Sequence, residues 1–299
     1  MSTAQLAQQW TVLSLLEWGS SYLSGKGFDE ARLTVDLLLA HVLHVKRLDL
    51  YLQFDRPLTA DELAGFKQLF RRRLGHEPLQ YILGETEFMG LAITVNSSVL
   101  IPRPETELLA ERALEACAAM TVPSLRILDV GTGSGNIAVV LGSRLPQAQI
   151  VAIDTSALAL ETARENIARH GLRNVEIDQV DIFGEGLGNR RFHLIVSNPP
   201  YVSRSEFEAL QPEIRDFEPR IATTDDGDGL SFYRRIVGLS DSLLFPGGAL
   251  MFEVGHGQSE AVSGLMRAAG LSRREWFQDD AGILRVVRGW MGGPATEGA

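Results

Sequence analysis

The sequence contains very little cysteine and no long hydrophobic run. Cys117 is the only cysteine among 299 residues, so neither an intrachain disulfide nor a cysteine-based metal site can form. No stretch reaches the ~18 uninterrupted apolar residues of a membrane span. The N-terminus also lacks the basic segment, apolar run and cleavage site of a secretion signal. These features predict a protein of the reducing cytoplasm with no membrane partner, in which Cys117 is a small buried side chain.

The sequence also lacks an excess of basic residues. It contains 28 Lys and Arg against 38 Asp and Glu, a net charge of −10. Residues 1–80 hold nine of each sign, so the rest of the chain carries the whole excess of acid. A protein that tracks nucleic-acid phosphates normally presents a basic face. We therefore expect no direct nucleic-acid binding, and the acidic part is compatible with a basic protein partner.

The N-terminal residues 1–83 show the pattern of a small helical domain. Apolar residues recur at spacings of three and four. They are Leu6, Trp10, Leu13 and Leu16, then Leu33, Leu37, Ala40 and Leu43. Asp29 and Thr59 are the expected N-caps of two helices. Packing and substrate docking are both open as roles for this domain.

Residues 84–104 change character and predict a β-hairpin and proline-rich linker. We expect strands over residues 88–95 and 99–101, joined by a turn at Asn96-Ser97-Ser98. Pro102 and Pro104 then stiffen the chain and remove two backbone donors.

From residue 105 to 290, apolar strands alternate with helices, and we expect a disordered tail over 291–299. The predicted helices cover residues 105–120, 156–170, 229–243 and 258–269, besides one after the first strand. The predicted strands cover residues 126–130, 149–154, 175–180, 192–197 and 249–254, with two more within 272–289. This order is typical of an α/β, Rossmann-like sheet of seven mostly parallel strands with helices on both faces.

A glycine-rich turn follows the first of these strands. Its residues are Gly131, Thr132, Gly133, Ser134 and Gly135. Glycines there allow a tight turn and a close approach of a ligand to the backbone. Since no Lys-Ser or Lys-Thr pair follows, the turn is not a phosphate-binding P-loop. Asp154 ends the second strand, where a carboxylate can accept ribose hydroxyls. These features fit a nicotinamide dinucleotide as well as S-adenosylmethionine.

A further acidic residue, Asp181, ends the third strand. In sheets of this type that position lies beside an adenine, and Ile182 and Phe183 would supply apolar contacts to its ring. A turn or helix cap explains Asp181 equally well.

The residues after strand 192–197 favour methyl transfer. They are Asn198, Pro199, Pro200 and Tyr201. A primary amide nitrogen is a poor nucleophile because its lone pair is delocalised into the carbonyl. The Asn198 side-chain oxygen and the Pro199 carbonyl would accept its two N–H bonds. The prolines fix the backbone, and Tyr201 offers a flat face. We predict that Asn198, Pro199 and Tyr201 are catalytic, that all four bind the substrate, and that S-adenosylmethionine is the cofactor. A merely rigid loop is the alternative.

The whole chain resembles the bacterial protein-(glutamine-N5) methyltransferases, and within them the branch that acts on release factors. The similarity includes the helical N-terminal domain, the glycine loop and the Asn-Pro-Pro-Tyr tetrad, together with residues 100–107, 217–220 and 253–258. It implies a class I methyltransferase fold and methylation of the glutamine in the Gly-Gly-Gln motif of peptide chain release factors. Cofactor contacts are implied for Gly131–Gly135, Asp154, Ile182 and Asn198, and a monomer is the default for this layout.

Some residues depart from the family pattern or have two explanations. Ile182 stands where relatives often have tryptophan, and residues 222–229 are more acidic than the usual turn. Arg103, Glu105 and Glu107 either contact the methionine end of the cofactor or only begin a helix. Phe88 either walls the target pocket or belongs to the core. No histidine shows a spacing typical of metal ligands.

Three other functions stay open at this point. The branch that methylates a ribosomal protein differs by serine and proline where this chain has Pro104-Glu105. An enzyme acting on adenine or cytosine would use the same tetrad on a flipped base, but it would need a basic recognition surface. A non-catalytic module with this fold would be expected to have lost the glycine loop or the tetrad.

Overall fold

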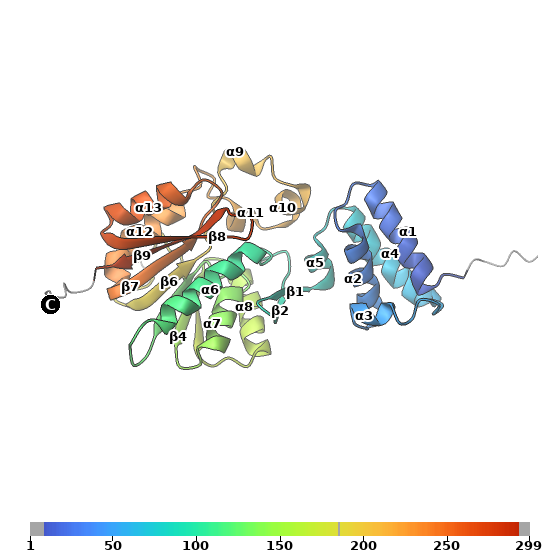
Figure 1. Cartoon of the computed structure of the whole chain (residues 1–299), viewed down its shortest axis with the longest axis horizontal. Coiled ribbons are helices and arrows are strands. Elements are labelled where there is room, and N and C mark those ends of the chain that lie inside the picture. The colour runs from blue at the N-terminus through green and yellow to red at the C-terminus, as the bar shows by residue number, and fades with distance from the viewer. Residues whose placement is uncertain (1–8, 185, 293–299) are drawn as a thin grey trace, which may run out of the picture. The chain divides into compact units, whose positions relative to one another are not determined.

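The computed structural model describes residues 9–184 and 186–292, and the chain divides into two compact units, Met1–Leu83 and Gly84–Ala299. Within its described residues the smaller unit is helical, as predicted (Figure 1). Its helices are α1 (Val12–Gly25), α2 (Ala31–Leu43), α3 (Arg47–Leu50), α4 (Ala60–Leu74) and α5 (Leu79–Leu83). Their apolar faces share one core that includes Leu16, Leu38 and Phe66.

The predicted helix starts are confirmed for α4 and wrong for α2. The Thr59 hydroxyl accepts from the Glu62 backbone, and the Glu62 carboxylate accepts from Thr59, a capping box. The N-cap of α2 is Glu30 rather than Asp29. Glu30 has a φ of 48°, and its side chain makes no capping hydrogen bond. Helix α1 begins after Thr11, so Trp10 precedes it. Leu6 lies outside the described residues.

The larger unit begins with a hairpin whose position differs from the prediction. Strands β1 (Glu85–Phe88) and β2 (Leu91–Thr94) pair antiparallel. The chain reverses at Met89-Gly90, where φ is 50° and 78°, because two successive left-handed residues match the twist of a tight hairpin. The predicted turn at 96–98 exists, since the Asn96 side chain accepts from the Ser98 backbone. Residues 99–101 form no strand after it.

Asn166 holds the hairpin against the rest of the larger unit. This fully buried side chain belongs to α8 (Ala157–Arg169). Its oxygen accepts from the Thr94 backbone at 2.7 Å, and its nitrogen donates to the Thr94 carbonyl at 2.9 Å. The same nitrogen donates to the Ser134 carbonyl at 2.9 Å. One amide therefore ties the hairpin, a helix and the glycine loop together.

The other elements of this unit form a mixed sheet and its helices (Figure 1). The strands are β3 (Arg126–Val130), β4 (Gln149–Asp154), β5 (Val175–Gln179), β6 (Phe192–Ser197), β7 (Leu244–Glu253), β8 (Leu271–Gln278) and β9 (Leu284–Met291). The helices, besides α8, are α6 (Pro104–Ala118), α7 (Asn136–Arg144), α9 (Arg204–Phe207), α10 (Pro212–Phe217), α11 (Arg220–Thr223), α12 (Ser231–Leu243) and α13 (Ser259–Ala268).

The seven strands lie in the order β5-β4-β3-β6-β7-β9-β8, and among them β9 runs opposite to the other six. The predicted seven-stranded, mostly parallel sheet is confirmed. β7 begins five residues earlier than expected, at Leu244. The expected tail begins with Met291, which is still part of β9. Residues 293–299 lie outside the described residues.

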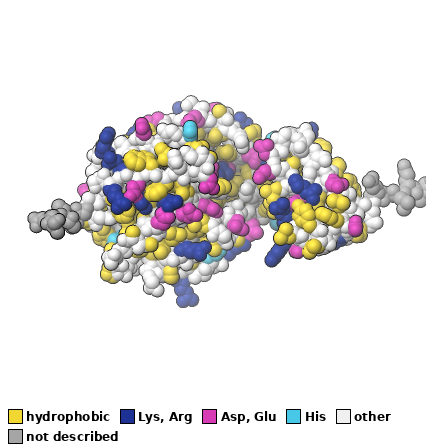
Figure 2. Space-filling view, in the orientation of Figure 1, with side chains coloured by type: hydrophobic (Ala, Val, Ile, Leu, Met, Phe, Trp, Pro, Cys, Tyr) yellow, Lys and Arg dark blue, Asp and Glu magenta, His cyan; other side chains and the backbone are white. Residues whose placement is uncertain are grey.

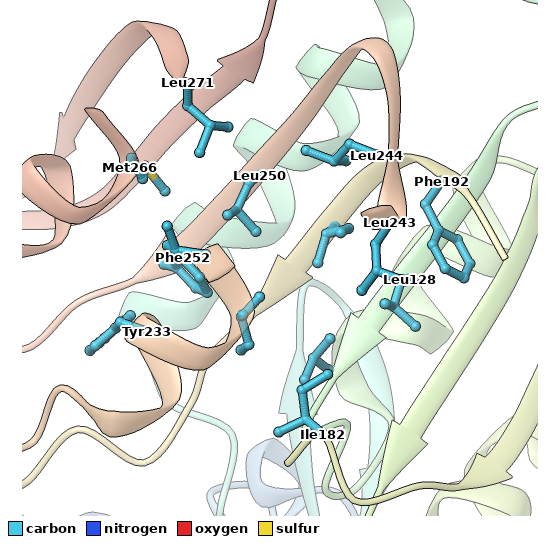
Figure 3. Packing of buried hydrophobic residues seen from close by; sticks show 14 of the residues in the cluster. Leu128, Ile182, Phe192, Tyr233, Leu243, Leu244, Leu250, Phe252, Met266 and Leu271 are labelled. Atoms are coloured by element: carbon cyan, nitrogen blue, oxygen red, sulfur yellow. The ribbon is translucent and has the colours of Figure 1, made fainter. Parts of the chain in front are cut away.

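Apolar layers cover both faces of the sheet, as the continuous apolar strands predict. On one face α12 and α13 pack over Leu128, Ile195 and Leu250, and on the other α6 and α7 pack over Leu194 and Val196. The first layer contains fully buried Tyr233, whose ring meets Phe252 edge-on at 5.1 Å (Figure 3). Cys117 is buried in the second layer, as expected, and burial raises its pKa to about 12.

Over the described part of the chain, every helix is too short or too polar to span a bilayer. Acidic, basic and apolar side chains are interspersed on the face shown in Figure 2.

Candidate active site

The topology of the sheet brings the predicted site residues to one edge. The glycine loop follows β3, Asp154 ends β4, Asp181 follows β5, and the tetrad follows β6. These four strands are neighbours and parallel, so their carboxyl ends open on the same side. The chain leaves β3 toward β4 on one side and returns to β6 on the other. Such a reversal of strand order creates a ligand-binding crevice.

A cavity of about 300 Å³ lies at this edge, within the size range typical of small-molecule sites. Its lining includes Gly131, Thr132, Gly133, Ser134, Asp154, Asp181, Ile182, Asn198, Pro199 and Pro200. The structure therefore brings ten of the twelve predicted residues together. Gly135 and Tyr201 lie outside this lining.

The glycine loop is shaped by backbone geometry. Gly131 and Gly133 have φ values of 74° and 54°, and no atom lies within 4 Å of a Cβ built on either. Their Cα atoms thus border open space that a side chain would fill. Gly135 has a different environment, because its Cβ would meet the Cβ of Ala163 at 3.1 Å. Gly135 allows α7 and α8 to pack closely.

Asp154 links the glycine loop to the end of β4. One carboxylate oxygen accepts from the Gly133 backbone at 3.0 Å, and the other accepts from the Ser156 backbone at 2.9 Å. Burial raises the pKa of Asp154, and its backbone donors oppose that shift. Each oxygen retains a lone pair at the cavity wall. The carboxylate is therefore oriented to receive a diol.

An apolar wall completes this half of the cavity. Ile182, Phe183 and Phe232 line it, and the two phenylalanine rings meet edge-on at 5.1 Å. Asp181 accepts from the Phe183 backbone at 2.9 Å, so it supports the turn as well as facing the cavity. Ile182 is 6% exposed. Two aromatic rings thus line the cavity together with Ile182.

The tetrad lies where β6 leaves the sheet. Buried Ser197 donates to the Val130 carbonyl at 2.7 Å and ties the ends of β6 and β3 together. The Asn198 side-chain nitrogen donates to the hydroxyl of Thr106 at 3.1 Å. Asn198 lines the cavity, and it is the nitrogen of its side-chain amide that makes this bond. Pro199 is buried and also lines the cavity.

Tyr201 is held at both its ring and its backbone. Its hydroxyl donates to Glu253 at 3.4 Å. Its carbonyl accepts from the Gln258 side chain at 2.9 Å. Burial, and secondarily the charge of Glu253, raise the pKa of the phenol. Tyr201 therefore stays neutral and keeps its proton as a donor.

Thr106 and Glu253 were not assigned a role from the sequence, whereas Arg103 had two explanations. Thr106 lines the cavity, and its hydroxyl donates to buried Glu253 at 2.6 Å. Arg103 also lines the cavity and pairs with Glu218 at 2.6 Å. Glu253 ends β7, the strand beside β6, so a polar residue at the end of an apolar strand was the available signal.

Phe88 and Glu107 each had two explanations from the sequence, and their contacts favour a structural role for both. Phe88 is 1% exposed and does not line the cavity, so it belongs to the core. Glu107 accepts from the Met89 backbone at 2.6 Å and supports the hairpin turn.

The unusually acidic segment near residue 225 satisfies its own charges. Asp225 accepts from the backbone of Gly227, Gly229 and Ser231, and Asp228 pairs with Arg234. These donors lower the pKa of Asp225, and Arg234 lowers that of Asp228 to about 2. The segment thus folds as a capped turn before α12.

No group of three or more His, Cys, Asp or Glu suited to a metal ion occurs within residues 9–184 and 186–292.

Sheet order, glycine loop and tetrad together define a Rossmann-like methyltransferase, and solved structures agree on the fold. The hMettl16 catalytic domain, solved with a MAT2A 3′UTR hairpin, matches with a TM-score of 0.54 at 16% identity, over 69% of this chain and 77% of that one. Human methyltransferase 10 domain containing protein matches with a TM-score of 0.51 at 18% identity, over 68% and 88%.

Sequence comparisons define the family more narrowly. Residues 14–84 match the PrmC N-terminal domain, and residues 105–214 match the methyltransferase small domain. The release factor glutamine methyltransferase of Geobacter sulfurreducens is 46% identical, over 95% of this chain and 98% of the relative. That of Chlorobaculum tepidum is 46% identical, over 82% and 85%. The chain belongs to the release factor glutamine methyltransferase family.

Proposed function

We propose that this enzyme transfers a methyl group from S-adenosylmethionine to the side-chain amide nitrogen of a glutamine, in the Gly-Gly-Gln motif of peptide chain release factors. The observation that carries the proposal is the juxtaposition of Asn198 and Pro199 with the cavity beside the glycine loop. Family membership supports the choice of substrate.

The cavity residues fit the cofactor. Asp154 would accept the ribose hydroxyls, because both its oxygens are held by backbone donors and still face the cavity. Gly131 and Gly133 leave room for a ligand against the backbone. Ile182 and Phe232 would contact the adenine ring. The bound cofactor would supply an electrophilic methyl group, and the electron pair of its carbon–sulfur bond would stay on sulfur when the nitrogen takes the methyl.

The tetrad would position the amide. The Asn198 oxygen and the Pro199 carbonyl would accept the two N–H bonds of the glutamine, which turns the nitrogen lone pair toward the methyl carbon. These acceptors also stabilise the positive charge that develops on nitrogen. The surplus proton leaves after transfer, so no ionised base has to act first. Positioning supplies the rest of the rate enhancement.

The proposal extends to the setting of the enzyme. Release factors act on ribosomes, so the proposed place of action is the cytoplasm, with the enzyme as a monomer. The acidic excess outside residues 1–80 supports a protein substrate rather than direct binding of nucleic acid.

The test is methyl transfer from radiolabelled S-adenosylmethionine to a purified release factor. We expect label on the wild-type factor and none on a variant whose Gly-Gly-Gln glutamine is changed to asparagine. Ribosomal proteins and an adenine-containing oligonucleotide are assayed in parallel. Label on either of these, with none on the release factor, would refute the proposed substrate.

A further inference from the structure

A chain of hydrogen bonds runs from the cavity into the protein interior. The Asn198 nitrogen donates to the Thr106 hydroxyl at 3.1 Å, and that hydroxyl donates to Glu253 at 2.6 Å. Tyr201 donates to the other oxygen of Glu253 at 3.4 Å. Thr106 and Glu253 are 2% and 1% exposed, so water does not compete for these bonds. Thr106 belongs to α6, Glu253 to β7, and Asn198 and Tyr201 to the loop after β6.

The donor and acceptor in each of these hydrogen bonds follow from how many protons each group can donate. A hydroxyl has one proton to donate. An ionised Glu253 can only accept, so the Thr106 hydroxyl donates its one hydrogen bond to the carboxylate. Thr106 can then only accept from Asn198, and Asn198 has to use its nitrogen. The amide oxygen of Asn198 is left as the group available at the cavity.

We infer that Thr106 and Glu253 are positioning residues that fix which end of the Asn198 amide faces the substrate. The inference rests on the proposed function, because the orientation matters only if the Asn198 oxygen accepts from the target amide. Neither residue needs to touch the substrate. Their effect passes through the amide, whose two ends have opposite hydrogen-bonding character.

A protonated Glu253 would remove the constraint. It could donate to Thr106, which would then donate to Asn198 and draw the amide oxygen away from the cavity. Burial, and secondarily the charge of Glu105, raise the pKa of Glu253 to about 7, while Thr106, Arg285 and Tyr201 oppose the shift. Tyr233, from α12, donates to the backbone carbonyl of Glu253 at 2.9 Å. The required ionised form therefore gains population as the pH rises through about 7.

The first experiment compares Thr106→Val with Thr106→Ser in methyl transfer to the release factor. Valine keeps the shape and removes the hydroxyl, so kcat should fall on the order of tenfold to a hundredfold. The KM for cofactor and its Kd by calorimetry should change less than about threefold, since the cofactor-binding groups are untouched. Serine should restore kcat to within about threefold of wild type. Thr34→Val, at a buried threonine of α2, controls for loss of a buried hydroxyl.

The second experiment follows pH. Wild-type kcat should rise between about pH 6 and 8 with a midpoint near 7, and Glu253→Gln should lack this rise because glutamine does not titrate. Glu111→Gln, at an exposed residue of α6, should retain it. Without any turnover, the NMR signals of the Asn198 side-chain amide should shift with the same midpoint in wild type and stay constant in Glu253→Gln.

The outcomes separate the inference from the proposed function. A wild-type enzyme that binds cofactor but does not label the release factor would refute the function, whatever the variants do. An active wild type with full kcat in Thr106→Val, or with Thr106→Ser as slow as Thr106→Val, would overturn the inference. So would an amide signal in Glu253→Gln that still titrates near pH 7.

Discussion

At the scale of single residues, Asn198 has the most demanding position, because its two amide ends serve different partners. Asn198→Ala removes the acceptor for the target nitrogen, and we expect kcat to fall about a hundredfold or more, with a smaller effect on cofactor affinity. Steady-state kinetics with the release factor measure this loss. Asn189→Ala, at an exposed residue, should behave as wild type. Near-normal turnover in Asn198→Ala would contradict the assigned role.

Asp154 makes a separate prediction about the cofactor. Asp154→Ala removes a charged acceptor of the ribose hydroxyls, a kind of bond that contributes about 1.5–3 kcal/mol. We therefore expect the Kd for S-adenosylmethionine to rise about tenfold to a hundredfold in calorimetry. Asp241→Asn, at an exposed residue of α12, is the matched control. Unchanged affinity in Asp154→Ala would remove this residue from the cofactor site.

Local sequence explains which of these residues were predictable. Asp154 and Asn198 each directly follow or end an apolar strand, so one short pattern places them at the edge of the sheet. Thr106 and Glu253 lie 147 residues apart, and only the folded chain shows that they share a hydrogen bond. The sequence also gave no reason to separate Gly135 from the other glycines of the loop, because its contact with Ala163 depends on how two helices pack.

At the scale of elements, the turn before α12 packs against the backbone of the tetrad. Gly229 has a φ of 77°, and a Cβ there would overlap with the carbonyl oxygen of Tyr201. Gly229→Ala should lower the free energy of unfolding by roughly 1–3 kcal/mol and reduce kcat by displacing Tyr201. Urea unfolding and kinetics measure the two effects. Gly238→Ala in α12, where no atom lies within 4 Å of the added carbon, should stabilise by about 0.5–1 kcal/mol. Equal behaviour of both variants would refute this close-packing argument.

Elements differ in how far the sequence predicts them. Strands β3 to β6 were predicted almost to the residue, because their apolar runs end sharply in polar or glycine-rich loops. The hairpin was misplaced, because residues 88–95 read as one apolar strand although Met89-Gly90 reverses the chain. A left-handed methionine has no strong sequence signature. Similarly, no pattern indicated that Glu30, with its left-handed backbone, would precede α2.

At the scale of the whole molecule, two buried carboxyls make stability depend on pH. Burial raises the pKa of Asp129 from 3.8 to about 7 and that of Glu253 from 4.5 to about 7. At pH values between the ordinary and the raised pKa of each group, the folded state thus binds more protons than the unfolded state. Their stabilising contribution is complete below about pH 4 and is lost as the pH rises through 7, by an amount on the order of a few kcal/mol.

A variant that lacks both carboxyls tests whether they make the protein less stable as the pH rises. Asp129→Asn combined with Glu253→Gln should show a flatter dependence of unfolding free energy on pH between 5 and 8 than wild type. Chemical denaturation at several pH values measures it, with Asp241→Asn, the loss of one exposed carboxyl, as the control. A double variant with the wild-type pH dependence would show that neither group titrates in this range.

Asn166 has a further consequence for the order in which the larger unit folds. Its amide joins Thr94 to α8 across 72 residues of chain and Ser134 across 32. The hairpin lies within residues 85–94 and closes through local contacts, but its docking has to wait until α8 has formed and the longer loop has closed. The backbone amide of Thr94 should therefore gain protection from hydrogen exchange late during refolding, after the strand amides of β3 and β4.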